Sequence, residues 1–89
     1  MRIVWDEPKR RTTLSKHGYD FADLSPDFFS DALVQRVQMD RQQAIALHAG
    51  RLVAVVFVPL GSEAVSVISM RRASRKERKA YEAQHPADH

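Results

Sequence analysis

The sequence has no cysteine among its 89 residues, and only three glycines and four prolines. Without thiols, the chain can form neither a disulfide framework nor a thiolate metal site. The three glycines are too scattered for a glycine-rich phosphate loop. The longest apolar stretch, Leu52 to Leu60, is far too short to cross a bilayer. With no basic-then-apolar leader at its start, the sequence predicts one small cytoplasmic, bacterial-type domain over residues 1–89, without a membrane segment.

Positive charge is in surplus and unevenly spread along the chain. The formal net charge is +3, made up of +3 over Arg2–Gly18, −4 over Tyr19–Asp40 and +4 over Arg41–His89. Within the last part, Arg71–Lys79 holds six basic residues against Glu77 alone. A concentrated positive cluster on a small domain favours a polyanion such as RNA or DNA. A solvated helix face is the alternative, and charge alone favours neither.

The N-terminal third is predicted to be helical after a short β-prone start at residues 2–5. A first helix over residues 7–17 has Asp6 at its N-cap and Gly18 as a left-handed stop. A second helical segment follows from residue 20, and Pro26 interrupts it. Two short turns would fit this interruption, but the preferred interpretation is a restart with Ser25 as cap and Pro26 at the first position.

From residue 32 the pattern changes to short runs rich in Val, Ile, Leu and Phe. Connections of two to five residues between them imply hairpins and an antiparallel meander. The third run is apolar on both faces and is expected to be central, with Pro59 ending it. The four expected strands cover residues 32–37, 43–48, 51–58 and 64–70.

A final helix is predicted from Ser74, which forms a capping box with Glu77. The helix should run to about Ala83, followed by a frayed tail over residues 84–89 that contains Pro86. The expected class is α+β: an antiparallel sheet of about four strands, with two N-terminal helices and a C-terminal helix packed on one curved face.

The histidines argue against a metal centre. His17, His48, His85 and His89 share no ligand-like spacing, and the last two follow the expected end of the final helix. Neither a metal nor a cofactor is therefore expected. RNA cleavage needs none, because the substrate's own 2′-hydroxyl can attack the adjacent phosphate. The protein must then supply a base, an acid, and cations for the developing charge.

Residues of these types are present at two places in the sequence. Arginine forks match phosphate geometry, so the junction between the last strand and the last helix is the natural place for a scissile phosphate. Each candidate also has a structural role open to it: the end of the first helix suits basic residues, and Glu77 completes a capping box. The candidates are Lys16 and His17 on the first helix, and Arg71, Arg72, Arg75, Lys76 and Glu77 at the junction.

Several motifs, in order, resemble the BrnT family of toxins. They cover residues 3 to 81, and their shared patterns are W-D-x-x-K, K-H-G-x-x-F and I-S-x-R-x-A-x-x-x-E-R. In this chain they read Trp5-Asp6-Glu7-Pro8-Lys9, then Lys16-His17-Gly18 with Phe21, then Ile68-Ser69-Met70-Arg71 continuing to Arg78.

The resemblance implies a RelE-like fold and the toxin half of a type II toxin–antitoxin pair. Such a toxin is an endoribonuclease that a ribbon-helix-helix antitoxin of the BrnA type neutralises by binding the basic face. Operator DNA is bound only through that antitoxin. The candidate functional residues carried over by position are Lys9, Lys16, His17, Arg41, Arg71, Arg75 and Glu77. The resemblance adds Lys9 and Arg41 to Lys16, Arg72 and Lys76 as RNA-binding residues, and it leaves His17, Arg71, Arg75 and Glu77 as the catalytic set.

Two positions depart from the family pattern. Thr13 stands where members often carry Asn, and Ser66 stands where an Arg usually precedes the Ile by two residues. Loss of one phosphate contact by that Arg would remove about 1.5–3 kcal/mol. The alternative hypothesis is therefore a non-catalytic BrnT-like protein that binds an antitoxin and takes part in transcriptional autoregulation. A generic nucleic-acid binder is a third, weaker hypothesis, which predicts salt-dependent binding without strand scission.

Overall fold

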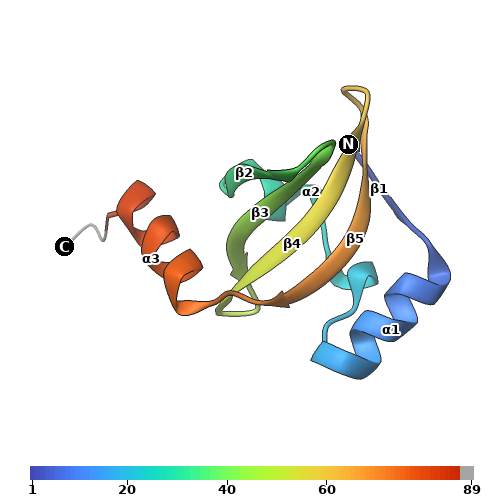
Figure 1. The fold of residues 1–89 in the computed structure, drawn as a ribbon, viewed down its shortest axis with the longest axis horizontal. Helices are drawn as coiled ribbons and strands as arrows, with labels where there is room; N and C mark the ends of the chain where they lie inside the picture. The colour runs from blue at the N-terminus through green and yellow to red at the C-terminus, as the bar shows by residue number, and fades with distance from the viewer. Residues whose placement is uncertain (87–89) are drawn as a thin grey trace.

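A mixed β-sheet forms the body of the molecule (Figure 1). The structure is a computed structural model that describes residues 1–86. Within that range the sheet has five strands in the order β1-β5-β4-β3-β2. The strands are β1 (Arg2–Trp5), β2 (Leu33–Gln38), β3 (Arg41–His48), β4 (Arg51–Leu60) and β5 (Ala64–Arg72). The helices are α1 (Glu7–His17), α2 (Pro26–Ser30) and α3 (Arg75–Gln84), with a 3-10 turn, η1 (Phe21–Asp23).

The expected four-stranded antiparallel sheet is wrong in two respects, and β1 accounts for both. This strand is a fifth member of the sheet, and it runs parallel to β5, with Arg2 opposite Ala64 and Trp5 opposite Val67. The side chains of Ile3 and Trp5 pack against the buried core. A four-residue segment whose partner lies some 60 positions along the chain carries no local sign of that pairing, because tertiary contacts determine it.

The other four strands form the expected antiparallel meander. Pro59 does not end β4, which continues to Leu60 opposite Ala64. The pairing of β4 with β3 extends only to Phe57, so Pro59 lies where β4 has a single neighbour. Proline is tolerated at such an edge because no ladder there requires its missing N–H.

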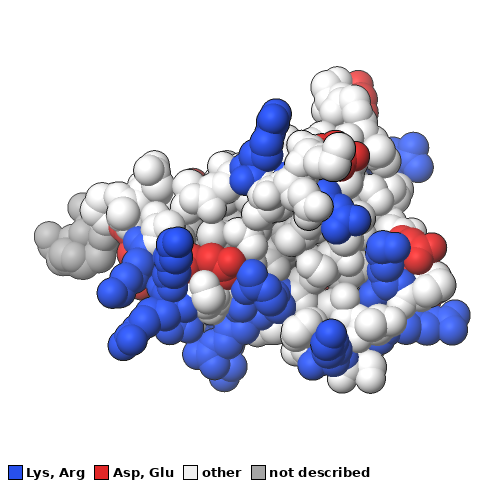
Figure 2. Space-filling model, viewed as in Figure 1, with Lys and Arg blue, Asp and Glu red and all other residues white. Residues whose placement is uncertain are grey.

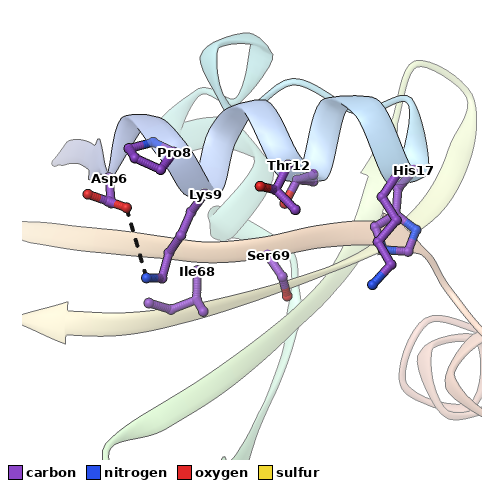
Figure 3. Close-up of a pocket in the computed structure, with 9 residues that line it drawn as sticks. Asp6, Pro8, Lys9, Thr12, His17, Ile68 and Ser69 are labelled. Atoms are coloured by element: carbon purple, nitrogen blue, oxygen red, sulfur yellow. Dashed lines mark ion pairs between the residues drawn. The ribbon is translucent and has the colours of Figure 1, made fainter.

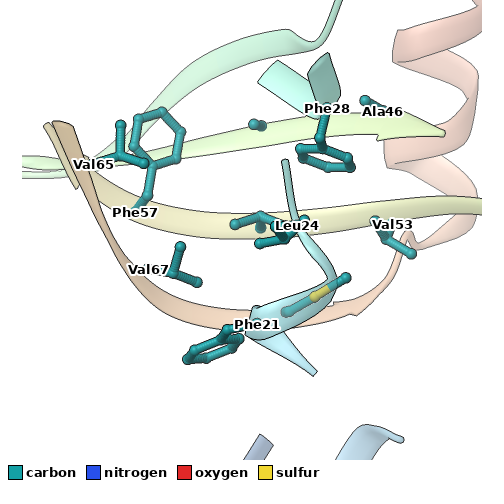
Figure 4. Close-up of a cluster of buried hydrophobic side chains, with 11 residues drawn as sticks. Phe21, Leu24, Phe28, Ala46, Val53, Phe57, Val65 and Val67 are labelled. Atoms are coloured by element: carbon teal, nitrogen blue, oxygen red, sulfur yellow. The ribbon is translucent and has the colours of Figure 1, made fainter. Parts of the chain in front are cut away.

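Helices lie on both faces of the sheet, not on one as expected. The larger core covers the face behind the sheet in Figure 1, and it includes Phe21 of η1, Leu24 just after η1 and Phe28 of α2 (Figure 4). Ile45 and Ala54 point to the opposite face, where Tyr81 of α3 packs against them. The front face is thus flanked by α3 at one end and by α1, which packs on β5, at the other.

The helix ends follow the sequence closely. Gly18 ends α1 in the left-handed conformation (φ 78°), and its N–H donates to the carbonyl of Leu14. Asp6 and Ser25 hold the N-cap positions of α1 and α2 as expected, although neither side chain makes a capping hydrogen bond. The helix α3 runs to Gln84, one residue beyond the expected end. Of the expected frayed tail, residues 87–89 lie outside the described part of the chain.

In the part of the chain that the structure describes, no helix is long and apolar enough to cross a membrane.

Candidate functional site

An ion pair joins β5 to α3 at the junction where the sequence placed a scissile phosphate. The Arg71 guanidinium donates through Nη1 to Glu77 Oε1 and through Nη2 to Glu77 Oε2, both at 2.8 Å. This two-point geometry is the strongest form of an arginine–carboxylate contact. Arg71 Nη1 also donates to the carbonyl oxygen of Arg72 at 3.1 Å. The arginine head group is therefore held in one orientation from two sides.

Two further groups complete the surroundings of the Glu77 carboxylate. The backbone N–H of Ser74 donates to Oε1 at 2.8 Å, and Ser74 Oγ in turn accepts the N–H of Glu77 at 3.2 Å. This is the predicted capping box. The side-chain Nε2 of Gln43 on β3, which the sequence reading did not single out, donates to Oε2 at 3.0 Å. Each carboxylate oxygen thus accepts two hydrogen bonds, which is the full capacity of the group.

These contacts fix the protonation state of Glu77. The hydrogen bonds from Arg71, with those from the Ser74 N–H and Gln43, lower the pKa of Glu77 from 4.5 to about 2, against the opposing effect of partial burial. The same ion pair raises the pKa of Arg71. Glu77 is consequently ionised at neutral pH and has no free acceptor position, an arrangement that suits holding Arg71 better than moving a proton.

Part of the Arg71 guanidinium remains available. An arginine carries five N–H groups, and three of those of Arg71 donate to Glu77 and Arg72. The remaining pair, Nε–H and the second N–H of Nη2, point in the same direction and have no partner within residues 1–86. The side chain is 38% exposed. Arg71 is therefore partly exposed, and its two remaining N–H groups form a fork of the geometry that binds phosphate bidentately.

A pocket lies beside this junction, between α1 and β5 (Figure 3). Its volume is about 360 Å³. Lys9 and His17 reach it from the helix, above Ile68 and Ser69 on the strand. Lys16 also lines it. The Lys9 ammonium is 4.0 Å from a carboxylate oxygen of Asp6. The full lining consists of Asp6, Pro8, Lys9, Thr12, Thr13, Lys16, His17, Ile68 and Ser69.

An irregularity in β5 brings the pocket and the arginine to one face of the sheet. Val56 of β4 pairs with Ser69, but the next residue, Phe57, pairs with Val67, so Ile68 is an extra residue in β5. Beyond this bulge Ser69 and Arg71 alternate onto the front face. Two positions along a strand separate their Cα atoms by about 7 Å. Ser69, which lines the pocket, is thus close to the backbone of Arg71 on the same face of the sheet.

The remaining predicted residues are more dispersed. Arg75 and Lys76 are exposed in the first turn of α3, close in the chain to the junction. Arg72 pairs with Val53, a residue of the larger core, so its side chain leaves the sheet on the face opposite to Arg71. Arg41 begins β3, four residues before Ile45. Ile45 pairs with Ala54, which pairs with Arg71, so Ile45 and Arg71 lie in one row across the sheet. Arg41 is therefore about 13 Å along the strand from that row.

Positive charge is concentrated along this side of the molecule. In Figure 2 the Lys and Arg side chains gather from the region of α3 across the lower part of the front face to α1, with a small acidic spot among them. Within residues 1–86 no group of three or more His, Cys, Asp or Glu side chains could hold a metal ion. The site therefore offers fixed cations, hydroxyl groups and an imidazole.

The helix α1 is fixed in place by a second ion-pair network that the sequence reading missed. Arg10 donates to both carboxylate oxygens of Glu7, at 2.8 and 2.7 Å, and to both of Asp20, at 3.1 Å. The indole N–H of Trp5 also donates to Glu7 at 3.1 Å. Hydrogen bonds from Arg10 and then Trp5 lower the pKa of Glu7 to about 2. This network connects β1, α1 and the start of η1.

A small α+β protein with a basic face and an oriented arginine has the features typical of proteins that bind polyanions, and comparison with known proteins identifies the family. A family model described as the ribonuclease toxin, BrnT, of type II toxin–antitoxin systems matches residues 5–77. The chain belongs to this family.

A solved structure gives the same result. The chain is similar to the ribonuclease toxin BrnT of Brucella abortus, whose crystal structure was determined at 1.1 Å resolution. The two are 55% identical in sequence with a TM-score of 0.79, over 84% of this chain and 99% of that one. No curated protein matches the chain. The expected membership of the BrnT family is therefore confirmed.

Proposed function

We propose that this toxin is a metal-independent endoribonuclease that cleaves RNA by attack of the 2′-hydroxyl on the adjacent phosphate. The observation that carries the proposal is the partly exposed Arg71 fork, which Glu77 holds in place on β5, the strand that also lines the basic pocket under α1. RNA lies across the front face of the sheet, between α1 and the junction of β5 with α3. The RelE-like character that the family resemblance implies is part of this proposal, as is action in the cytoplasm.

The geometry supports the following proposed roles. Arg71 binds the scissile phosphate and stabilises the charge that develops on it, because a preorganised cation acts most strongly there. His17 at the pocket moves the proton, since imidazole is the commonest general acid–base group. Glu77, ionised and fully hydrogen-bonded, orients Arg71. Lys9 and Lys16 bind neighbouring phosphates in the pocket, and the exposed Arg75 and Lys76 extend the basic surface. Arg72 was also expected to bind RNA, but its side chain leaves the sheet on the opposite face, so the proposed RNA path does not include it.

Ser66 is the position that favours a second candidate, the non-catalytic toxin homologue. Val58 pairs with Ser66 and Val56 with Ser69, so both serines lie on the front face with Arg71. An arginine at position 66 would therefore add a cation to the proposed RNA path. Gln42 pairs with Phe57, so continuing this register by one residue places Arg41 opposite Val58. Val58 pairs with Ser66, so Arg41 lies on the front face two strands from Ser66. We propose that Arg41 supplies the distal phosphate contact in its place.

The partner we propose is a ribbon-helix-helix antitoxin of the BrnA type. It neutralises the toxin by covering the basic front face, so that RNA and antitoxin compete, and only the antitoxin contacts operator DNA. Positive charge on the RNA-binding face suits an acidic segment of such a partner equally well. Addition of the antitoxin should displace a labelled RNA from the purified toxin. Simultaneous binding of both would contradict a shared face.

Cleavage chemistry provides the direct test of the proposed function. Purified protein is incubated with a short RNA in the presence of EDTA, and with the same RNA carrying one 2′-deoxy sugar at the cut position. The proposal expects cleavage that EDTA does not affect, products ending in a 2′,3′-cyclic phosphate and a 5′-hydroxyl, and no cut at the deoxy position. Binding without scission would favour the second candidate, and Ser66→Arg should then restore cleavage. Cleavage at the deoxy position would contradict the mechanism.

A further inference from the structure

Gln43 is a buried polar residue whose surroundings call for an explanation. It is the third residue of β3 and is only 5% exposed. Its neighbours on the strand, Ala44, Ile45 and Ala46, are buried and apolar. A buried amide is found where its hydrogen bonds are needed, because an unpaired one is costly. Its Nε2 donates to Glu77 Oε2 at 3.0 Å, across 34 positions of sequence.

The contact is directional. An ionised carboxylate only accepts hydrogen bonds, so the amide must present its NH₂ group to Glu77 and its oxygen elsewhere. Glu77 Oε2 is the oxygen that also accepts from Arg71 Nη2. The outer N–H of that same Nη2 belongs to the free fork of Arg71. Gln43 therefore contacts the same carboxylate oxygen, Oε2, that orients the Nη2 group of the fork.

We propose that Gln43 is a positioning residue for RNA cleavage: its side-chain amide fixes Glu77 and, through it, the phosphate-binding fork of Arg71. The inference rests on the proposed function. With Gln43 included, the site is built from three elements, β3, β5 and α3, and not only from the junction of β5 with α3. The capping box orients one carboxylate oxygen from within α3, and Gln43 orients the other from the sheet. Without Gln43, the carboxylate can pivot about its capping-box contact and turn the guanidinium with it.

The first test removes the donor and preserves the volume. Gln43→Met should lower kcat for RNA cleavage about tenfold and change KM little. A loss of about tenfold is what we expect when one hydrogen bond that orients the site for the transition state is removed. Gln42→Met is the matched control, because Gln42 is the adjacent glutamine on the opposite face of the same strand. It should leave both constants unchanged. An equal loss in both variants, or a loss confined to KM, would overturn the inference.

The second test measures how activity depends on pH, because a purely structural role of Gln43 would not change that dependence. Gln43→Glu places a second carboxyl against Glu77, and two such groups in contact do not both ionise, so one pKa is raised. While protonated, the introduced carboxyl donates to Glu77 as the amide does. The activity of Gln43→Glu relative to the wild type should therefore recover about tenfold as pH falls through that raised pKa, whereas the ratio for Gln43→Met should stay flat. A flat ratio for Gln43→Glu would overturn the inference.

These outcomes separate the inference from the function on which it rests. If the wild type cleaves RNA, Arg71→Ala does not, and Gln43→Met matches the wild type, then the inference alone fails. If the wild type does not cleave RNA at all, the proposed function fails and the inference fails with it.

Discussion

Removing the charge of Glu77 should destabilise the protein in a way that depends on pH. Glu77→Gln preserves the shape of the side chain but sets an NH₂ group against donors of Arg71 and Gln43. The pKa of the Glu77 carboxyl is about 2 in the folded protein, against an ordinary value of 4.5. Because its pKa is depressed in the folded state, the contacts of Glu77 stabilise the fold fully above pH 4.5. That stability is lost as pH falls toward about 2.

The size of the effect follows from the same shift. A pKa lowered from 4.5 to about 2 corresponds to about 3 kcal/mol of unfolding free energy at neutral pH. Arg71 is 38% exposed, so solvent screening reduces the expected loss in Glu77→Gln to about 2 kcal/mol at pH 7. For a chain of this length, that corresponds to a decrease in Tm of about 8–16 °C.

Urea unfolding of wild type and variant from pH 7 to pH 2 measures this difference directly. Glu7 also has a pKa of about 2, so both proteins lose stability in acid, and only the difference between them isolates Glu77. Glu82→Gln, an exposed change on the same helix, is the control and should have little effect. A variant as stable as wild type at pH 7, or a difference that persists unchanged to pH 2, would refute the reasoning.

Two further predictions concern α1. Arg10→Ala should lower the Tm and speed backbone amide exchange in α1, because Arg10 joins Glu7 to Asp20. The control is Arg11→Ala, which should change both quantities less because Arg11 makes a single, longer contact to Glu7. Equal effects of the two would contradict the role given to the network. Lys16→Ala should weaken RNA binding and reduce the slope of log K against log salt by about 1, as expected for a lost phosphate contact. An unchanged slope would place Lys16 outside the RNA path.

Local signals in the sequence predicted the parts of the fold that local interactions determine. Gly18 ends α1 because it adopts positive φ readily, and Ser74 with Glu77 begins α3 through contacts only three residues apart. The placement of β1 could not be predicted in the same way. Its parallel partner, β5, is distant in sequence, and four residues carry too little pattern to select it.

The candidate site shows the same division. Arg71, Glu77, Lys16 and His17 could be proposed from the sequence because residue type and family motif single them out. The contact between Arg71 and Glu77 was not foreseen, since the capping box already accounted for that carboxylate. Gln43 carries no sequence signal beyond being polar within a buried strand, and only the register of three strands brings it to Glu77.

The bulge at Ile68 explains why the periodicity of β5 could not be read correctly. Val67 and Met70 are both fully buried in the larger core, although residues three apart on a regular strand point to opposite faces. The extra residue restores the alternation and sets Ser69 and Arg71 on the front face. Simple alternation from Val67 would have put both on the core side.

Induced expression in a bacterium tests the central claim most directly. The wild-type chain, Arg71→Ala and the matched Arg72→Ala are expressed in parallel, with growth and total RNA followed over time and folding checked on each purified protein. The account expects growth arrest and RNA fragmentation with the wild type and, because Arg72 leaves the sheet on the opposite face, nearly the same with Arg72→Ala. Folded Arg71→Ala should leave growth and RNA intact. Arrest and fragmentation by Arg71→Ala equal to those of the wild type would contradict the account.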